Sequence, residues 1–419
     1  MRALSRLQST AAARRKREQL LYYLLPLGLL LVYMLFVSCR KMNDGSNNQL
    51  NYYQIHYLYT YDHGFVSRGL VGEIVSWFMD TVSIRDINTI SVFMSLPMLV
   101  GAALCIGSAL SRTKTRADSL TANDDDRMVH RFVLLMVVVL CILPVTFRAY
   151  VGDLKLDKLL WGLTLFAVLL TEHSVGIWFT IPLCFLATVI NPVFLFCSML
   201  LISIILLQKL FDSSFSKKNL AICLVSYVGM IALGLFSALS EKKLGFADGY
   251  EMVDYYYARF ADNLTAEARQ ALVETCLFDY FLPVGEVFKK TYEIYFMDWT
   301  NGMLLLWNTL FTAVPIYAVL IWFWRKVIKN TEAPLQKIVY LLCAVSPVVT
   351  VPVIILSWES SKYFANNILV QVILILYFLL QGRQEVVAAL REAIDTAKRR
   401  RFFCVALIAE LALCMQRQS

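Results

Sequence analysis

Long apolar stretches separated by short polar segments set the pattern of this chain. A helix needs roughly 20 mostly apolar residues to cross the hydrocarbon core of a bilayer. Seven apolar stretches of 13 to 24 residues are the clear candidates for such helices: 20–38, 87–110, 132–147, 220–239, 303–324, 338–356 and 368–380. A further apolar stretch follows residue 158, and polar residues at 171–174 and 191–192 divide it into three shorter candidates: 159–170, 177–190 and 193–211. The pattern predicts about ten transmembrane helices.

The composition supports the membrane interpretation. Of the 419 residues, 58% are hydrophobic and 17% are charged, whereas a soluble domain carries about 25% charged residues. Such a chain lacks the polar residues needed to cover one globular core of this size. The same composition excludes a disordered or collagen-like chain. We therefore expect an all-α integral membrane protein that crosses the plasma (inner) membrane several times, with the lipid bilayer as a partner.

The distribution of charge predicts the orientation. With the N-terminus in the cytoplasm, the inner segments hold 25 basic and 12 acidic residues, and the outer segments hold 14 basic and 19 acidic residues. Cytoplasmic loops of membrane proteins carry such an excess of Lys and Arg. Residues 1–19 and 381–419 are then basic cytoplasmic ends, the second of them amphipathic, and 20–380 form the membrane domain. The outer loops are predicted at 39–86, 148–158, 240–300 and 357–367.

The net charge of +8 is spread over the loops between spans, so it does not indicate nucleic-acid binding. Apart from Lys209, near the end of the stretch 193–211, the predicted spans contain no charged residue, whereas ion-coupled transporters place ionisable groups inside the membrane. The polar residues collect in the outer loops, two of which are long. We therefore expect the protein to act at the outer face of the membrane.

The first outer loop holds the most distinctive polar residues. Five tyrosines between positions 52 and 61 precede Asp62, His63 and Arg68. We consider Asp62, His63 and Arg68 as candidate catalytic residues and Tyr61 as a candidate substrate-binding residue. An acid, a histidine and an arginine within seven residues, behind an aromatic run, are unusual for a segment that only anchors the chain.

The residues after Asp62 predict a helix at the membrane interface. Apolar side chains recur at three-to-four spacing over about 63–79. Gly69 and Gly72 permit close approach of another helix or of a lipid phosphate. In the alternative interpretation, Asp62 only caps this helix and Arg68 only reaches a lipid headgroup.

Two shorter outer turns are also rich in polar residues. The first holds five charges in eleven residues, and its candidate substrate-binding residues are Arg148, Asp153, Lys155 and Asp157. The second contributes Glu359 and Lys362, beside Trp358 and Tyr363. In one interpretation these are a solvated turn and an aromatic belt. In the other, the outer ends of the helices meet, and the two turns bind phosphate and hydroxyl groups.

The long outer loop 240–300 combines aromatic and acidic residues. Its part 246–260 includes three consecutive tyrosines, and 265–276 is predicted as a helix capped by Thr265. Trp299, before the next span, is a candidate substrate-binding residue. Aromatic rings flanked by carboxylates suit carbohydrate, because rings stack on sugar C–H faces and carboxylates accept hydroxyl hydrogens. The alternative is an amphipathic cap that packs on the helix bundle.

The sequence offers no cofactor or metal signature. His56 and His63 with Asp62 have no recognised ligand spacing, and no phosphate-binding or dinucleotide-binding glycine motif occurs. We therefore predict neither a bound metal nor a cofactor, and the sequence gives no ligand set for a divalent cation.

The layout resembles two classes of membrane enzyme. In glycosyltransferases with the C-type fold, which use a lipid-linked sugar donor, a first span is followed by a long outer loop with an interfacial helix and an early acidic residue. Asp62 stands after the apolar stretch 20–38, where that acidic residue is expected. The plan of ten or more spans with large outer loops is similar to O-antigen and capsule polymerases of the Wzy type.

This resemblance implies a glycosyltransferase or polysaccharide polymerase of cell-surface glycan synthesis. Its expected partners are a polyprenyl-linked saccharide and other membrane proteins of glycan assembly. Asp62 would act as a base or orient the acceptor hydroxyl, while Arg68, Arg148, Lys155 and Lys362 would neutralise the phosphate leaving group. Two other classes stay open, namely a lipid-linked glycan flippase or other envelope transporter, and a scaffold of an envelope complex.

Overall fold

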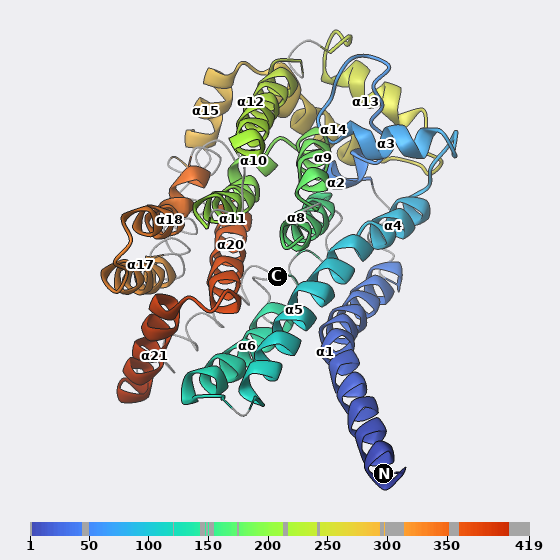
Figure 1. The fold of residues 1–419 in the computed structure, drawn as a ribbon. Helices are drawn as coiled ribbons and strands as arrows, with labels where there is room; N and C mark the ends of the chain where they lie inside the picture. The colour runs from blue at the N-terminus through green and yellow to red at the C-terminus, as the bar shows by residue number, and fades with distance from the viewer. Residues whose placement is uncertain are drawn as a thin grey trace.

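The computed structural model describes residues 2–43, 50–119, 121–142, 147, 150, 155–173, 176–212, 217–240, 244–293, 297, 314–351 and 360–401. Every regular element in these ranges is a helix, which confirms the all-α prediction (Figure 1). In the same ranges, extended backbone segments pair at one isolated bridge, between Val82 and Phe260.

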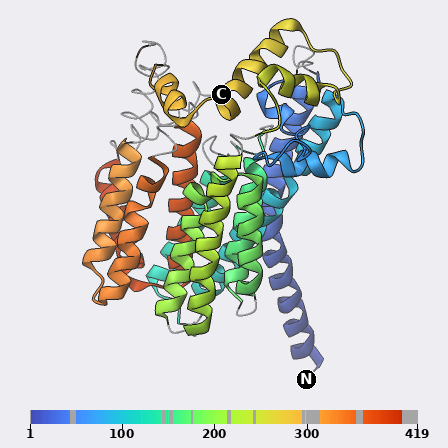
Figure 2. The same cartoon turned by 90° about the horizontal axis from the view of Figure 1, so that it is seen from above.

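Most of the helices run side by side in a bundle (Figure 2). Its members are α1 (Arg2–Asn43), α4 (Ile84–Phe93), α5 (Leu96–Ala117), α6 (Asp124–Ile142), α8 (Asp157–Thr171), α9 (Gly176–Ile190), α10 (Phe194–Cys197), α11 (Met199–Phe211), α12 (Lys217–Ser240), α17 (Val314–Lys329), α18 (Pro334–Val345) with the 3₁₀ turn Ser346–Thr350, and α20 (Ser360–Leu380). Helices α1 and α5 approach closely at Gly107, where a Cβ atom would lie 2.3 Å from the Tyr23 ring.

Shorter helices form a layer at the end of the bundle opposite the start of α1, which we call the end layer (Figure 2). It contains α2 (Tyr52–Ile55), α3 (Gly69–Ser76), α13 (Gly249–Tyr257), α14 (Ala266–Cys276) with the π-helical turn Leu277–Phe281, and α15 (Val284–Tyr292). The two long predicted outer loops therefore lie at the same end of the molecule. The Thr265 side chain accepts a hydrogen bond from the Ala268 amide, which confirms the predicted cap of α14.

The amphipathic helix α21 (Gln384–Arg399) follows α20 after a bend of 119°. Gly382 makes the turn with φ of 71°, a conformation that glycine adopts without steric cost. Val386, Val387 and Leu390 are buried on one face of α21, so the helix packs along the protein. Helix α21 is amphipathic and lies within the stretch 381–419 that was predicted to be amphipathic, and residues 402–419 of that stretch lie outside the described residues.

Within the described ranges, two helices are long and apolar enough to cross a bilayer. They are 17–38 within α1 and 84–117, which runs through α4 and α5. The bent pair of α20 and α21 would raise this number to three if it counts as one span. These are fewer than the ten spans that the hydrophobic pattern predicts.

The difference has a physical cause in the stretch 159–211. Helices α8 and α9 have 15 residues each and α11 has 13. At 1.5 Å per residue these helices measure roughly 20–22 Å, less than the ~30 Å hydrocarbon core. The chain turns at Glu172 and at Asn191 before either helix reaches full length. Parts of the predicted spans 132–147, 303–324 and 338–356 lie outside the described residues.

Candidate functional site

Two segments far apart in the sequence hold the end layer together. The Tyr256 hydroxyl donates a hydrogen bond to the Thr60 carbonyl oxygen (3.1 Å), and the Arg259 guanidinium donates to the Leu58 carbonyl oxygen (2.9 Å). Tyr256 is fully buried. Helix α13 and the residues directly after it therefore fix the backbone immediately before Asp62.

A second connection lies at the start of α4. Val82 and Phe260 form the isolated bridge, with hydrogen bonds of 2.8 and 3.0 Å through the Val82 amide and carbonyl. The Asp262 carboxylate accepts a hydrogen bond from the Ile84 amide at 2.7 Å. The segment after α13 thus caps the helix that continues into the bundle, which ties the end layer to α4 and α5.

Helix α3 lies directly on the backbone of Tyr59. A Cβ atom at Gly72 would lie 2.3 Å from the Tyr59 carbonyl oxygen and 2.8 Å from its amide nitrogen. Only glycine fits such an approach without displacement of the backbone. The predicted close approach is therefore present at Gly72, and its partner is the preceding segment of the same chain.

Asp62 is exposed on the end layer. Its Oδ2 atom accepts hydrogen bonds from the hydroxyls of Thr60 (2.7 Å) and Tyr255 (3.0 Å). These donors, Thr60 first, stabilise the charged form and lower the pKa of Asp62 below its ordinary value. The carboxylate is therefore ionised at neutral pH and links the first long segment to α13.

The interpretation of Asp62 as a helix cap is wrong. Helix α3 begins at Gly69, its N-cap residue is Arg68, and no side chain caps it. Gly64 has φ of 119° and Arg68 has φ of 66°. A right-handed helix does not continue through residues with positive φ, so residues 62–68 form turns and the predicted helix over 63–79 is shortened to Gly69–Ser76.

His63 lies among aromatic rings beside Asp62. Its ring stacks on Phe246 with centroids 4.4 Å apart and meets the edge of Tyr255 at the same distance. The Gly245 amide donates to the His63 carbonyl oxygen at 2.8 Å. The imidazole is half-buried, so Asp62 and His63 together present a carboxylate next to an aromatic surface.

Tyr61 supports this surface from the other side of Asp62. Its ring stacks on Phe65, and its amide donates to the Glu73 carboxylate at 3.0 Å. Burial, and secondly the charge of Glu73, raises the pKa of Tyr61 to about 12. Tyr61 is therefore a neutral ring at physiological pH.

Arg68 contacts residues other than Asp62. Its Nη1 atom lies 3.2 Å from Nε2 of His56, which is 2% exposed, and its amide donates to the Ile190 carbonyl oxygen at 2.9 Å. These contacts place Arg68 between α2 and the end of α9. The sequence pattern did not indicate that His56 lies next to Arg68.

The turn that precedes α8 reaches the same end layer. The Lys155 ammonium lies 4.5 Å from the centre of the Tyr53 ring, a cation–π contact. Asp157 and Lys158 are buried at the start of α8, and Lys158 donates to the Ser91 hydroxyl at 2.5 Å. The interpretation of this turn as fully solvated is therefore wrong, since two of its charges lie inside the protein.

A small cavity brings the two short predicted turns together. Asp157 and Tyr150 line it with Tyr363 and Asn366 of α20. Its volume of about 20 Å³ holds one water-sized group. The side chains of Asp157, Tyr363 and Asn366 are all more than nine-tenths buried. Described residues of the two short predicted turns therefore lie close together at the starts of α8 and α20.

Several predicted site residues cannot be placed. Arg148, Asp153, Glu359 and Trp299 lie outside the described residues, and so does the side chain of Lys362 at the start of α20. In the described part of the chain, no three His, Cys, Asp or Glu side chains gather as metal ligands.

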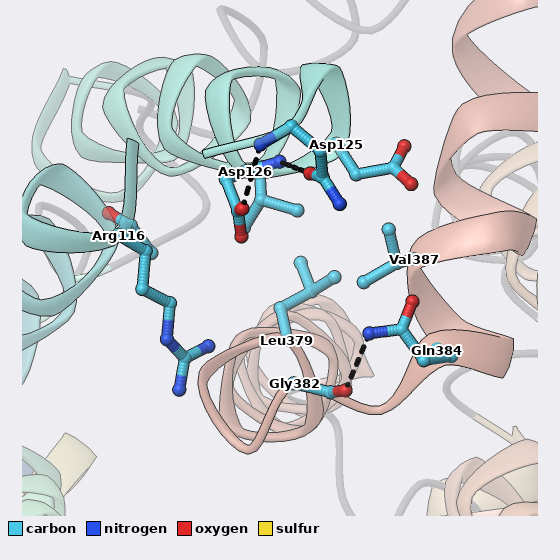
Figure 3. Close-up of a pocket in the computed structure, with 10 residues that line it drawn as sticks. Arg116, Asp125, Asp126, Leu379, Gly382, Gln384 and Val387 are labelled. Atoms are coloured by element: carbon cyan, nitrogen blue, oxygen red, sulfur yellow. Dashed lines mark hydrogen bonds between the residues drawn. The ribbon is translucent and has the colours of Figure 1, made fainter. Parts of the chain in front are cut away.

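A separate polar pocket of about 210 Å³ lies at the other end of the bundle (Figure 3). Arg116, Asp125, Asp126 and Gln384 line it. Arg116 donates to the Leu380 carbonyl oxygen (2.9 Å), and the Asp126 amide donates to the Asn123 side chain (2.9 Å). Asp125 is paired with Arg391 of α21. The contacts of Arg116 with α20 and of Asp125 with α21 stabilise the turn between these two helices, while the hydrogen bond between Asn123 and Asp126 lies at the start of α6.

The residues that complete the Asp62 site come from α13 and the segment before it. The aromatic and acidic composition of 246–260 marked the segment that contains Phe246 and Tyr255 as a candidate for saccharide binding. Nothing in the sequence indicates that Tyr255 contacts Asp62. No protein-family model, curated protein or solved structure matches the chain. Its function is therefore inferred from the site and from the layout of the sequence.

Proposed function

We propose that this protein is a membrane-embedded glycosyltransferase or polysaccharide polymerase. It takes a saccharide from a polyprenyl phosphate or diphosphate carrier at the extracytoplasmic face and transfers it to a growing cell-surface glycan. The end layer is the extracytoplasmic side in this proposal, because the basic segments lie toward the other end. The proposal also places the protein in the plasma membrane as a multi-pass protein.

The observation that supports the proposal most is the environment of Asp62. The carboxylate is exposed, accepts two hydroxyl hydrogens, and lies beside the rings of His63 and Tyr255. A saccharide needs the same two features from its site, namely an acceptor for its hydroxyl groups and an apolar ring for its C–H face. Both features come from segments whose mutual position is fixed by several hydrogen bonds.

The charge of Asp62 limits its chemical role. A carboxylate with a lowered pKa is ionised but is a weak base. Its main role is therefore to orient the acceptor hydroxyl and to stabilise positive charge on the sugar ring. It is less suited to removing the hydroxyl proton at an early stage of the reaction. The hydroxyl proton can pass to the carboxylate late in the reaction, when the new glycosidic bond has largely formed.

The leaving group is a phosphate or diphosphate, which needs charge neutralisation more than protonation. In this proposal Lys155 and Arg68 contribute positive charge near the end layer, and Arg148 and Lys362 are further candidates from the two short turns. Asp157 acts from the buried cavity as a positioning group, while Tyr61 and Trp299 contact the saccharide.

The experiment compares Asp62→Asn with Asp80→Asn in cells whose own gene has been deleted. Asp80 is an acidic residue of the same segment and lies outside the Asp62 site, so Asp80→Asn is a matched control. We expect Asp62→Asn to abolish extension of the surface glycan and to cause its lipid-linked precursor to accumulate, with unchanged protein level. Normal glycan length in Asp62→Asn would refute the role of this carboxylate.

One observation favours a lipid-linked glycan transporter as a second candidate. Asp157 and Lys158 are ionisable groups inside the protein, and buried ionisable groups are typical of transport pathways in membranes. Purified protein in lipid vesicles distinguishes the two candidate functions. A transferase makes a new glycosidic bond from lipid-linked saccharides that are already on the end-layer side, whereas a transporter only moves them across the bilayer.

A further inference from the structure

A further cavity, separate from the two described above, lies among the helices of the bundle, toward the end away from Asp62. It has a volume of about 340 Å³ and is bounded by α5, α8 and α20. Along α5 it extends from Leu104 to Arg112, which is about 12 Å at the helical rise of 1.5 Å per residue. None of its lining residues belongs to the site around Asp62.

The cavity is apolar over most of its length and charged at one end. Its walls are mainly aliphatic and aromatic, with Leu104, Leu165, Phe166, Leu169, Ile373 and Leu376 among the lining residues. Arg112, Glu172 and His173 lie together at the end of the cavity where α8 stops. Leu104 is 38% exposed, so the apolar part reaches the outer surface of the bundle.

The other cations of this region already stabilise helix ends. Lys209 donates to the Thr171 carbonyl oxygen at the end of α8, and Arg116 donates to the Leu380 carbonyl oxygen at the end of α20. They offset the partial negative charge of these C-termini. Arg112 is therefore not needed for that purpose.

Arg112 is available to an external anion. It pairs with Glu172 through Nη1 at 2.8 Å, and its side chain is 45% exposed. A guanidinium has five N–H donors, so the pair with Glu172 leaves others for a phosphate. An apolar slot with a guanidinium at its mouth has the polarity of a phospholipid, whose chain is apolar and whose headgroup is anionic.

We propose that this cavity binds one hydrocarbon chain of an anionic phospholipid, with the lipid phosphate at Arg112. The cavity extends about 12 Å along α5, and its volume of about 340 Å³ suits a single extended hydrocarbon chain. The bound lipid fills the space between α5, α8 and α20 and stabilises their packing. The proposal is independent of the saccharide chemistry proposed at Asp62.

The first test is native mass spectrometry of the full-length, delipidated protein with phosphatidylglycerol and phosphatidylcholine of the same chains. Ser108 lines the cavity and is half-buried, whereas Ser111 lies on the same helix and does not line it. Ser108→Phe fills the cavity, and Ser111→Phe is the matched control. Retention on size-exclusion chromatography identifies folded variants.

We expect one tightly bound phosphatidylglycerol in the wild type and in Ser111→Phe. Its affinity should fall about tenfold in Ser108→Phe, the effect of removing roughly two buried methylene groups. Arg112→Gln should remove the preference for phosphatidylglycerol over phosphatidylcholine. Equal lipid binding by Ser108→Phe and Ser111→Phe would overturn the proposal, and so would an unchanged preference in Arg112→Gln.

A second test changes the cavity lining only at Leu104, which lies at its exposed edge. A benzophenone side chain at Leu104 is irradiated in the full-length protein within native membranes. A cross-link that adds the mass of a phospholipid supports the proposal. A cross-link to the protein's own residues 402–419 would show that the chain itself occupies the cavity, and it would overturn the proposal.

Discussion

Substitution of Gly72 by alanine tests how closely α3 rests on the segment that leads to Asp62. The new Cβ atom would lie 2.3 Å from the Tyr59 carbonyl oxygen, and ordinary contact begins near 3.4 Å. Either α3 or the Tyr59 backbone must therefore move by about 1 Å. Both are buried, so the displacement spreads to Gly69 and Tyr61, which also pack closely.

The magnitude follows from the cost of overpacking. Extra atoms in a well-packed interior cost about 1–3 kcal/mol, and the clash with backbone places Gly72→Ala at the upper part of that range. Replacement of glycine by alanine within a helix stabilises the helix by up to about 1 kcal/mol, which offsets part of this cost. We expect the free energy of unfolding to fall by about 2 kcal/mol. For a chain of this length, that is a decrease of roughly 2 °C in the melting temperature.

The assay is thermal unfolding in detergent micelles, followed by tryptophan fluorescence. Gly285→Ala is the matched control, since Gly285 lies in α15 and, among the described residues, no atom beyond its chain neighbours and its own helix backbone lies within 4 Å of the position that a Cβ atom would take there. Gly285→Ala should leave the melting temperature unchanged or raise it slightly. If Gly72→Ala were as stable as Gly285→Ala, the contact between α3 and Tyr59 would not exist as described.

Two further predictions concern hydrogen bonds of buried and exposed charges. Tyr255→Phe removes a hydrogen-bond donor that lowers the pKa of Asp62, and the pKa of Asp62 should therefore rise. The acid side of the pH profile of saccharide transfer should move to higher pH. An unchanged profile would show that Asp62 does not control the rate. Ser91→Ala removes a hydrogen bond of the buried Lys158 ammonium and should cost about 1–3 kcal/mol of unfolding free energy. Addition of Lys158→Met should recover most of this loss, because an apolar side chain of similar size no longer needs the hydroxyl; equal stability of Ser91→Ala and wild type would contradict this.

Local signals in the sequence predicted several elements correctly. Thr265 caps α14 because its hydroxyl is the nearest acceptor for the free amide of Ala268. The same type of reasoning failed for Asp62. Its carboxylate accepts hydrogen bonds from Thr60 and Tyr255, and the positive φ of Arg68 prevents an earlier helix start.

Within the described residues, the hydrophobic pattern overestimated the number of helices long enough to cross a bilayer. Apolar length alone does not distinguish a helix that faces lipid from a short helix buried in a bundle. The chain turns at Glu172 and Asn191, and the short helices α8 and α9 pack against one another, with α8 also against α5. Gly162 illustrates this packing, since a Cβ atom there would lie 2.7 Å from the Pro97 ring.

The candidate site could be located in part from the sequence. Asp62, His63 and Tyr61 were predicted as a group, and the structure places them on one surface. Tyr255 could not be assigned, because contacts between residues so distant in sequence depend on how α13 packs. The burial of Lys158 was likewise hidden, since five charges within eleven residues suggest a solvated turn.

The rate of saccharide transfer by purified protein in lipid vesicles directly tests the role of Asp62 in transfer. The donor is the pool of polyprenyl-linked saccharides extracted from membranes of the source cells, supplied on the end-layer side. Asp80→Asn should transfer at the wild-type rate, and Asp62→Asn should be slower by about 10²–10³-fold, the usual effect of losing a group that stabilises charge at the reacting centre. Equal rates for the two variants would contradict the account.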